Sequence, residues 1–340
     1  MYSSFVNRWG DLSMINAAIV GLGRWGQNLV DSVQGSSSNI SFVAGITRTK
    51  SNAVDYCKKN NIDLRDTYEE VIGDSNIDAV VLATPHSQHA DQIMKAASFG
   101  KHVFSEKPFT LDAKSAQAAV DACMKAGVVV ALGHNRRFME NIIALKALVE
   151  SGELGTLLHI DGNQSSDLSG TASTWRDSRN ESPAGGMTSL GIHALDCMIH
   201  MGGRIEEVDC YSTRRAIPCD IDDATASVIR FERGMTGTLV SLASSPRIWQ
   251  LRVVGTGGWA EATDNKTLAI CRGGEIETQF FTDSPYPHMP SITGELEAFA
   301  MAALGQAPYP ITPAEMVHGS AVLEAIIKSA SLGKRVRPQG

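Results

Sequence analysis

The stretch GLGRWG at positions 21–26 decides how the first part of the chain folds. It matches the pattern G-x-G-x-x-G in the context that the pattern needs, because an apolar strand precedes it and a helix follows. Gly21 permits a tight turn, Gly23 lets the backbone approach a pyrophosphate, and Gly26 lets helix and strand pack closely. The free N–H groups of the helix N-terminus suit phosphate oxygens. The motif therefore predicts a dinucleotide site.

Outward from this motif, the first 135 residues alternate between short apolar runs and helical patterns. A strand such as AVVLA at 79–83 is apolar throughout, as strands buried on both faces are. Repeated β-α units predict a doubly wound parallel sheet with helices on both faces. The predicted strands cover 16–21, 41–46, 79–83, 102–105 and 128–133, and the helices cover 25–33, 51–60, 87–99 and 111–126.

The pattern changes after residue 133, where strands follow one another with few helices between them. Strands without crossover helices predict a large open, mostly antiparallel sheet, and hence an α+β domain. The strands are predicted over 157–162, 208–212, 224–231, 236–241, 251–255, 268–271 and 275–281, and the helices over 138–151, 193–201, 292–303 and 313–331. The last helix begins with a capping box and an N1 proline. We expect a Rossmann domain over 14–135 and a substrate-binding and oligomerisation domain over 136–340.

Composition narrows the class of protein. The chain has 340 residues and a net charge of -7, and its Lys and Arg do not form a long run, so we expect no nucleic-acid partner. No apolar segment is long enough to span a bilayer. Residues 1–13 lack the apolar core of a secretory signal, and Met14 is an alternative start. Six Cys without a C-x-x-C pair predict reduced thiols, a cytoplasmic protein and no metal site.

The end of the second strand bears on which cofactor binds. An NAD site usually has an Asp or Glu there for the ribose 2′-OH, but the sequence reads ITRTK over 46–50. Thr47 and Arg48 can bind a 2′-phosphate, with Lys50 and Arg24 adding charge nearby. We therefore expect NADP(H). The alternative is NAD(H), with Arg48 and Lys50 as solvated loop charges.

Several further segments, in order and spacing, resemble the Gfo/Idh/MocA family of sugar and cyclitol oxidoreductases over about residues 14–336. They are ATPHSQH at 83–89, SEKP at 105–108, GHNRRF at 133–138, Gly185-Gly186, and GIH at 191–193 with Asp196. The resemblance implies a Rossmann domain, an α/β domain with a large open sheet, and an active site between the two. It also implies a homodimer or homotetramer formed through the outer face of that sheet.

The resemblance assigns catalysis to Lys107 and His193. Lys107 would hydrogen-bond the reacting oxygen and stabilise developing negative charge. His193 would be the general acid/base, for which an imidazole is suited. The alternatives are a surface Lys beside a loop Pro and a His that only packs or caps. The resemblance also suggests a cis Lys107-Pro108 bond, and it makes Glu106 a structural or cofactor-side neighbour.

The chain departs from the family pattern at Ser189, where many members have an Asp four residues before the His. A Ser can hydrogen-bond, but it cannot supply charge to stabilise an imidazolium. Asp196 lies on the same helical face as His193 and is expected either at the active site or in a structural role. Because a polyol-binding carboxylate is missing, the substrate class stays open.

The remaining site residues follow from position in the family pattern. One group is expected to contact the cofactor, and a second group to contact the substrate. The predicted cofactor group comprises Gly21, Gly23, Arg24, Trp25, Gly26, Thr47, Arg48, Ala83, Thr84, Pro85, His86, His89, Glu106 and Lys107, and the predicted substrate group comprises Lys107, Asn135, Arg136, Trp175, Arg176, Ser189 and His193. Of Arg136 and Arg137, one is expected to reach substrate or cofactor and the other to form a hinge salt bridge.

We therefore expect reversible hydride transfer between a nicotinamide and a carbinol or ketone carbon of a small polar ring compound, such as a sugar or cyclitol. One alternative keeps this chemistry on a cyclic dihydrodiol or a hydroxy acid. Another is a nucleotide-binding regulator without catalysis, because function does not follow from fold.

Overall fold

The structure is a computed structural model that describes residues 13–172, 174–281 and 289–340. Its first sheet has the strand order β3-β2-β1-β4-β5-β6, with all pairs parallel. The strands are β1 (Ile15–Val20), β2 (Ile40–Ile46), β3 (Asp63–Leu64), β4 (Ala79–Leu82), β5 (His102–Glu106) and β6 (Val130–Gly133). This is the doubly wound order that dinucleotide-binding domains share, and it confirms the predicted parallel sheet.

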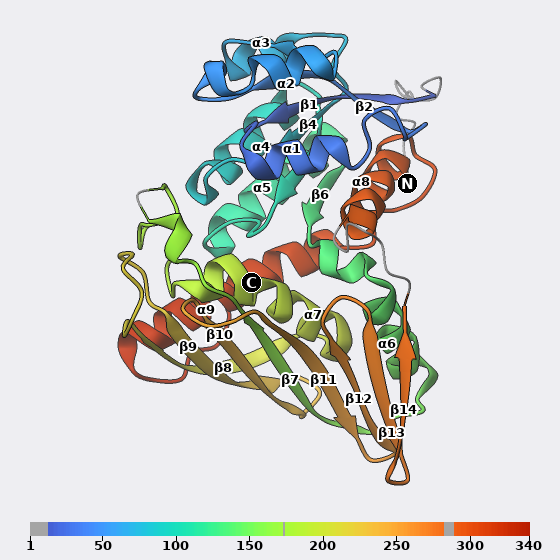
Figure 1. Cartoon of the computed structure of the whole chain (residues 1–340), viewed down its shortest axis with the longest axis vertical. Coiled ribbons are helices and arrows are strands. Elements are labelled where there is room, and N and C mark those ends of the chain that lie inside the picture. Colours follow the sequence, from blue (N-terminus) through green and yellow to red (C-terminus); the bar gives the residue numbers. More distant parts are fainter. Residues whose placement is uncertain (1–12, 173, 282–288) are drawn as a thin grey trace.

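Helices cover both faces of this sheet (Figure 1). Every residue of β4 is buried, as its uninterrupted apolar sequence predicts. The helices that follow the strands are α1 (Arg24–Asp31), α2 (Val54–Lys59), α3 (Tyr68–Gly73), α4 (His89–Ser98) and α5 (Ala113–Ala126). A later helix, α8 (Met289–Ala303), returns to this domain, where Leu296 and Phe299 join the core beneath the sheet.

The second sheet has the order β14-β13-β12-β11-β7-β10-β9-β8 and is antiparallel except where β10 pairs with β7. Burial alternates strictly along β9, so one face of the sheet packs inward and the other faces outward. The strands are β7 (Leu157–Ser165), β8 (Ile205–Thr213), β9 (Ala224–Phe231), β10 (Thr236–Leu242), β11 (Ile248–Gly255), β12 (Gly258–Thr263), β13 (Thr267–Arg272) and β14 (Glu275–Phe280). The predicted α+β domain with a large open sheet is thereby confirmed.

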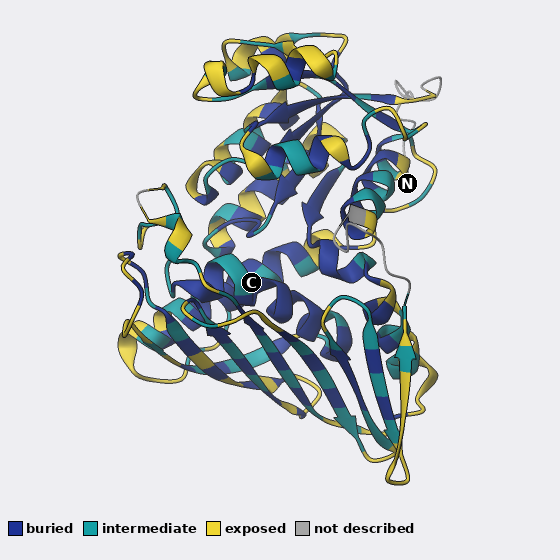
Figure 2. Cartoon of the chain, viewed as in Figure 1, coloured by how far each residue is buried: buried dark blue, intermediate teal, exposed yellow. Residues whose placement is uncertain are grey.

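Two helices, α7 (Ile192–Gly202) and α9 (Pro313–Leu332), lie between the second sheet and the first domain, whereas α6 (Glu140–Ser151) borders β12 and β13 (Figure 1). Figure 2 shows α7 almost entirely buried. The predicted capping box of α9 is present, with Thr312 and Glu315 bonded reciprocally. This middle layer brings α7 against the carboxyl ends of the first sheet's strands.

Two strands and one α-helix of the described residues were missing from the predictions. They are β3, α3 and β12. β3 has two residues, and α3 has six, so neither is long enough to show a period. β12 begins at Gly258, inside a segment that the Gly257-Gly258 pair marks as a turn. Within the described residues, no helix has the length and apolar character needed to cross a membrane.

Candidate active site

The glycine motif joins β1 to α1 at the carboxyl edge of the first sheet. Gly21 has φ +105°, and a Cβ added there would lie 2.5 Å from the carbonyl oxygen of Ala83. A Cβ on Gly26 would lie 2.0 Å from the carbonyl oxygen of Gly21. Gly23 is exposed, and nothing lies within 4 Å of the Cβ position that it leaves empty. Two glycines therefore permit close packing, and the third leaves open backbone where a pyrophosphate fits.

The residues predicted to choose the cofactor follow β2 directly. The backbone N of Gly21 donates to the carbonyl of Ile46 over 2.9 Å, which places the end of β2 beside the glycine turn. Arg48 is exposed, and no ion pair of its side chain occurs with any described residue. Lys50 forms an ion pair with Asp66 instead. Of the two predicted cations on this loop, Arg48 is the one whose charge is not already paired.

The loop after β4 carries Ala83, Thr84, Pro85 and His86 at the same edge of the sheet. The hydroxyl of Thr84 donates to Gln92 Oε1 over 2.6 Å. His89 is fully buried, and its ring nitrogens lie 2.9 Å from the Pro108 carbonyl and 3.1 Å from the Thr84 carbonyl. His89 therefore departs from the expectation of cofactor contact: it has no accessible surface, and it supports the loops that carry Thr84 and Pro108.

A loop of the second domain is fastened onto this loop. Glu181 accepts hydrogen bonds from the backbone N of Ser87, over 3.1 Å, and from the Ser87 hydroxyl. The ring of Trp175 stacks edge-on against His86 at 4.8 Å, and the Arg176 guanidinium lies 4.0 Å from the Trp175 ring centre. The predicted Trp175 and Arg176 thus lie beside the predicted cofactor loop.

Lys107 follows β5 and points across to the second domain. Its Nζ donates to the backbone carbonyl of Ser189 over 2.7 Å. Its backbone N donates to Glu106 Oε2 over 3.1 Å, while Glu106 Oε1 accepts from Trp25 Nε1 over 2.5 Å. Burial lowers the pKa of Lys107 to about 8, although the negative charge of Glu106 opposes that change. The Lys107-Pro108 bond is cis, as suggested.

His193 lies in the first turn of α7, after a π-helical turn over Met187–Gly191. Its pKa is well below the usual value, chiefly because it is buried and also because Lys107 and Arg136 are positively charged. The imidazole is therefore neutral near pH 7. Its Nδ1 is buried without a hydrogen-bond partner among the described residues, as is the hydroxyl of Ser189. Two orphaned polar atoms beside Lys107 are typical of a site that a ligand completes.

Asp196 belongs to a buried ion network. Arg137 donates to both of its carboxylate oxygens, over 2.8 and 2.6 Å, and also to Glu315 over 2.7 Å. These bonds join the end of β6 to α7 and α9. The structural role expected as one alternative for Asp196 therefore fits, and Arg137 is the member of the arginine pair that forms a salt bridge, which lies within the second domain.

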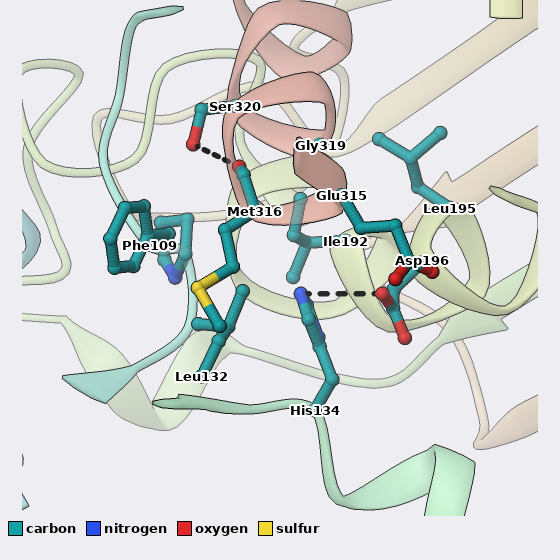
Figure 3. A pocket seen from close by; sticks show the side chains of 11 residues that line it. Phe109, Leu132, His134, Ile192, Leu195, Asp196, Glu315, Met316, Gly319 and Ser320 are labelled. Carbon is teal, nitrogen blue, oxygen red and sulfur yellow. Dashed lines mark hydrogen bonds and ion pairs between the residues drawn. The ribbon is translucent and has the colours of Figure 1, made fainter. Parts of the chain in front are cut away.

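His134 connects this network to the catalytic candidates. Its ring lies 6.0 Å from that of His193, centre to centre, and its Nε2 is 3.9 Å from Asp196 Oδ1. Figure 3 shows His134 facing Asp196 beside a small pocket to which Met316 and Ser320 of α9 also contribute. The pocket volume of about 10 Å³ suits one water molecule. A sugar-sized substrate does not fit there.

Arg136 points away from that network, toward the second sheet. Its guanidinium lies 4.4 Å from the ring centre of Trp249 on β11, and Nη1 donates to Asn265 Oδ1 over 2.7 Å. Asn135, the neighbouring prediction, is buried and donates to Ser291 of α8 over 2.9 Å. Arg136 thus lies on the second-domain side, near enough to Lys107 and His193 to lower the pKa of both.

The sequence did not indicate Glu181, Trp249, Asn265 or His134 as site residues. Glu181 and Asn265 lie in loops, where no periodicity marks them. Trp249 alternates along β11 like any core residue. His134 stands inside a family motif, but only the fold shows that it faces His193. The parts of the chain that the structure describes contain no group of three or more potential metal ligands.

This fold and site define a class: an oxidoreductase with a nicotinamide-dinucleotide domain and a second, substrate-side domain. Residues 15–134 match the model of the oxidoreductase family with an NAD-binding Rossmann fold, and residues 142–261 match the GFO/IDH/MocA C-terminal domain. The chain belongs to the Gfo/Idh/MocA family and is an NAD(P)-dependent oxidoreductase.

Similar proteins agree with this assignment. The chain is 30% identical to scyllo-inositol 2-dehydrogenase (NAD(+)) of Bacillus subtilis, over 72% of each chain. It is 29% identical to D-xylose 1-dehydrogenase (NADP(+)) 2 of Haloferax volcanii, over 79% of this chain and 83% of that one. A structure of levoglucosan dehydrogenase with NADH and levoglucosan has a TM-score of 0.85 at 19% identity, covering 96% of this chain and 100% of the other. This last likeness shows a shared fold.

Proposed function

We propose that this enzyme moves a hydride between nicotinamide C4 and a carbinol or ketone carbon of a small polar ring compound, a sugar, a cyclitol or a derivative. The observation that carries the proposal is that Lys107 contacts the π-helical turn directly before the helix that carries His193. Lys107 binds the carbonyl of Ser189, and His193 lies one helical turn further along the same segment. A cation and a neutral base at one point suit alcohol oxidation.

The two side chains divide the work. The nicotinamide, when bound, accepts the hydride that leaves the carbinol carbon. His193 takes the hydroxyl proton, for which a neutral imidazole is needed, and its lowered pKa keeps it neutral. The ammonium of Lys107 binds the substrate oxygen and stabilises the negative charge that develops as the proton leaves. In the reduction, His193 returns the proton and Lys107 polarises the carbonyl.

The cofactor domain supports NADP(H) over NAD(H). No carboxylate follows β2, and the exposed Arg48 stands next to Thr47 where a 2′-phosphate would lie. The relatives include one named for each cofactor, so family membership does not decide. The end of β2 is what favours the phosphate.

We also propose that the chain assembles into a homodimer or homotetramer through the outward face of the second sheet. Exposed apolar side chains lie on two neighbouring strands there: Tyr211 on β8 and Val228 on β9. Apolar groups gathered on one sheet face are typical of interfaces. Light scattering on the purified protein measures the assembly, and a monomer at micromolar concentration would contradict it.

A substrate panel tests the proposed activity. Sugars, cyclitols, cyclic diols and hydroxy acids are offered with NAD⁺ and NADP⁺, and reduction is followed by nicotinamide absorbance. We expect turnover of at least one polyhydroxylated ring. His193→Ala should lower kcat about 100-fold or more while cofactor affinity stays nearly unchanged. Tight NADPH binding without turnover of any compound would support the non-catalytic regulator instead, and turnover only of hydroxy acids or dihydrodiols would favour the non-sugar alternative.

A further inference from the structure

Arg136 is a buried cation for which none of the described residues supplies a counter-ion. Only 8% of its surface is exposed. The groups that its guanidinium contacts are neutral: the Trp249 ring at 4.4 Å, Asn265 Oδ1 at 2.7 Å and the Met139 sulfur at 3.2 Å. No ion pair joins it to a carboxylate of any described residue. Burying an unpaired guanidinium is costly, so such a group is expected to meet an anion when the site is filled.

The hydrogen bonds of Arg136 leave one edge of the guanidinium free. Nη1 donates hydrogen bonds to both Asn265 Oδ1 and the Met139 sulfur. Nε and Nη2 have no acceptor within the described parts of the chain. Both atoms keep some accessible surface, since neither is a fully buried atom without a partner. Nε and Nη2 together form the flat two-pronged edge that matches the two oxygens of a carboxylate. The free edge is therefore suited to a planar anion.

Two charged side chains close to Arg136, those of Arg247 and Lys107, are positive like Arg136 itself. Arg247 donates to the same Asn265 oxygen over 3.1 Å, so two guanidinium groups share one neutral acceptor. Arg136 and Lys107 are close enough that the charge of Arg136 lowers the pKa of Lys107. The buried carboxylates nearby are engaged elsewhere, Glu106 by Trp25 and Asp196 by Arg137. Glu106 acts on Lys107, but no described carboxylate pairs with Arg136.

The position of Arg136 points to the substrate rather than the cofactor. The side chain rests on Trp249 of β11 and on Asn265, between β12 and β13, both in the second domain. The cations that stand at the glycine motif and at the end of β2 are Arg24 and Arg48. The phosphates of a dinucleotide bind at that edge of the first sheet. Arg136 therefore lies on the second-domain side of the site, away from the edge that suits the dinucleotide phosphates.

We propose that the substrate carries a carboxylate, which Arg136 binds through its Nε and Nη2 edge while Lys107 and His193 act on a hydroxyl of the same molecule. The substrate class is thus a sugar acid or cyclitol acid rather than a neutral polyol. This inference rests on the proposed dehydrogenase function and narrows it. The Ser at position 189 agrees with it, because an Asp there would repel a carboxylate substrate.

Matched pairs of acid and neutral sugars test the inference. D-Glucuronate and D-galacturonate are compared with D-glucose and D-galactose, as substrates and as competitive ligands of the enzyme–cofactor complex. We expect an acid of the panel to exceed its neutral counterpart in kcat/KM or in affinity by about 100-fold. Arg136→Met should reduce that ratio to near one. Arg136→Lys keeps the positive charge but not the two parallel N–H donors, so it should leave an intermediate ratio.

A control arginine separates this effect from loss of folding. Arg252 lies on β11, the strand of Trp249, with its guanidinium 5.3 Å from the Trp259 ring centre, and it is paired with Glu261. Arg252→Met should leave the ratio of acid to neutral substrate unchanged. Thermal unfolding of both variants shows whether either substitution lowers stability. A loss of folded enzyme affects the acid and the neutral substrate equally, so it cancels in the ratio measured for one variant.

Three outcomes would overturn the inference: no acid preferred over its neutral partner, a preference that survives in Arg136→Met, or a preference for sugar phosphates over uronates. Each is distinct from failure of the proposed function, which would appear as turnover independent of His193 and Lys107. If neutral sugars are oxidised with full dependence on those two residues, the function stands and only the carboxylate assignment falls.

Discussion

The ammonium of Lys107 donates a 2.7 Å hydrogen bond to the backbone carbonyl of Ser189. The bond crosses from the end of β5 in the first domain to the π-helical turn before α7 in the second. A carbonyl accepts the hydrogen bond without neutralising the charge. Burial lowers the pKa of Lys107 to about 8, and the negative charge of Glu106 keeps it from falling further. The reacting oxygen of a substrate would meet a cation that titrates close to physiological pH.

The first prediction concerns the alkaline pH dependence of the reaction. Alcohol oxidation should lose kcat/KM above about pH 8, because the charged form of Lys107 exists only below its pKa. Glu106→Gln removes the negative charge that raises this pKa, so the alkaline limb should move to lower pH. Rate profiles from pH 6 to 10 measure it. A limb that stays in place in the variant would show that another group titrates.

The second prediction concerns the loop after β2. Arg48→Ala should weaken NADPH binding by about tenfold or more and change NADH binding little, because only the former has a 2′-phosphate. Lys50→Ala is the matched control: Lys50 is already paired with Asp66 and should matter less. Fluorescence titration with NADPH and NADH measures the two affinities of each variant. Equal losses for NADPH and NADH in Arg48→Ala would rule out contact with the phosphate.

The third prediction concerns the contact between Glu181 and Ser87. These bonds hold the second-domain loop over the loop after β4, so Glu181→Ala and Ser87→Ala should each raise the KM for cofactor severalfold. Glu181→Ala removes both bonds, whereas Ser87→Ala leaves the backbone N–H of residue 87 as a donor, so the double variant should be no worse than Glu181→Ala alone. Steady-state kinetics with varied cofactor measure it. Effects that simply multiply would mean that the two residues act separately.

The sequence predicted the fold well because both domains are periodic. β4 is apolar throughout and is buried on both faces. β9 alternates between buried and exposed residues, as a strand with one buried face should. The element bounds moved by a few residues, and only short or glycine-marked elements were missed. Lys107 and His193 were found because they stand in recognisable motifs.

The rest of the site could not be predicted, for identifiable reasons. Arg136 and Arg137 are adjacent in a short 3-10 helix over Asn135–Phe138, and the sequence could not say which one meets Asp196. Only the fold, which places α7 on one side and β11 on the other, separates their roles. Glu181 reaches the cofactor loop from 94 residues away in sequence, a contact that no local pattern marks.

The fourth prediction concerns stability in acid. Burial lowers the pKa of seven histidines. The pKa falls to about 4 for His102, His134, His200 and His318. The other three are His86, His89 and His193. The unfolded chain therefore binds protons below about pH 6.5 that the folded chain does not, and stability should fall as pH drops toward 5. A histidine that is protonated in the unfolded chain and neutral in the folded chain contributes a slope of about 1.4 kcal/mol per pH unit.

One of these histidines can be removed with its hydrogen bond preserved. Nε2 of His318 accepts from the backbone N of Ile205 over 2.9 Å, and a glutamine oxygen can accept there instead. His318→Gln should therefore make the free energy of unfolding fall less steeply between pH 6.5 and 5. Urea unfolding at several pH values measures the slope. A slope unchanged from that of the parent protein would show that His318 does not resist protonation in the folded state.

The fifth prediction restores the carboxylate that the family pattern has at position 189. Ser189→Asp places a negative charge beside Lys107 and His193, so it should raise the pKa of both. The alkaline limb of kcat/KM should then move above pH 8, and the acid limb should move up with the His193 pKa. If the substrate is an acid, its advantage over the neutral sugar should shrink, because the new carboxylate repels it. Ser189→Asn, which adds similar bulk without charge, should move neither limb. Identical profiles for the two variants would mean that the side chain at 189 faces away from both groups.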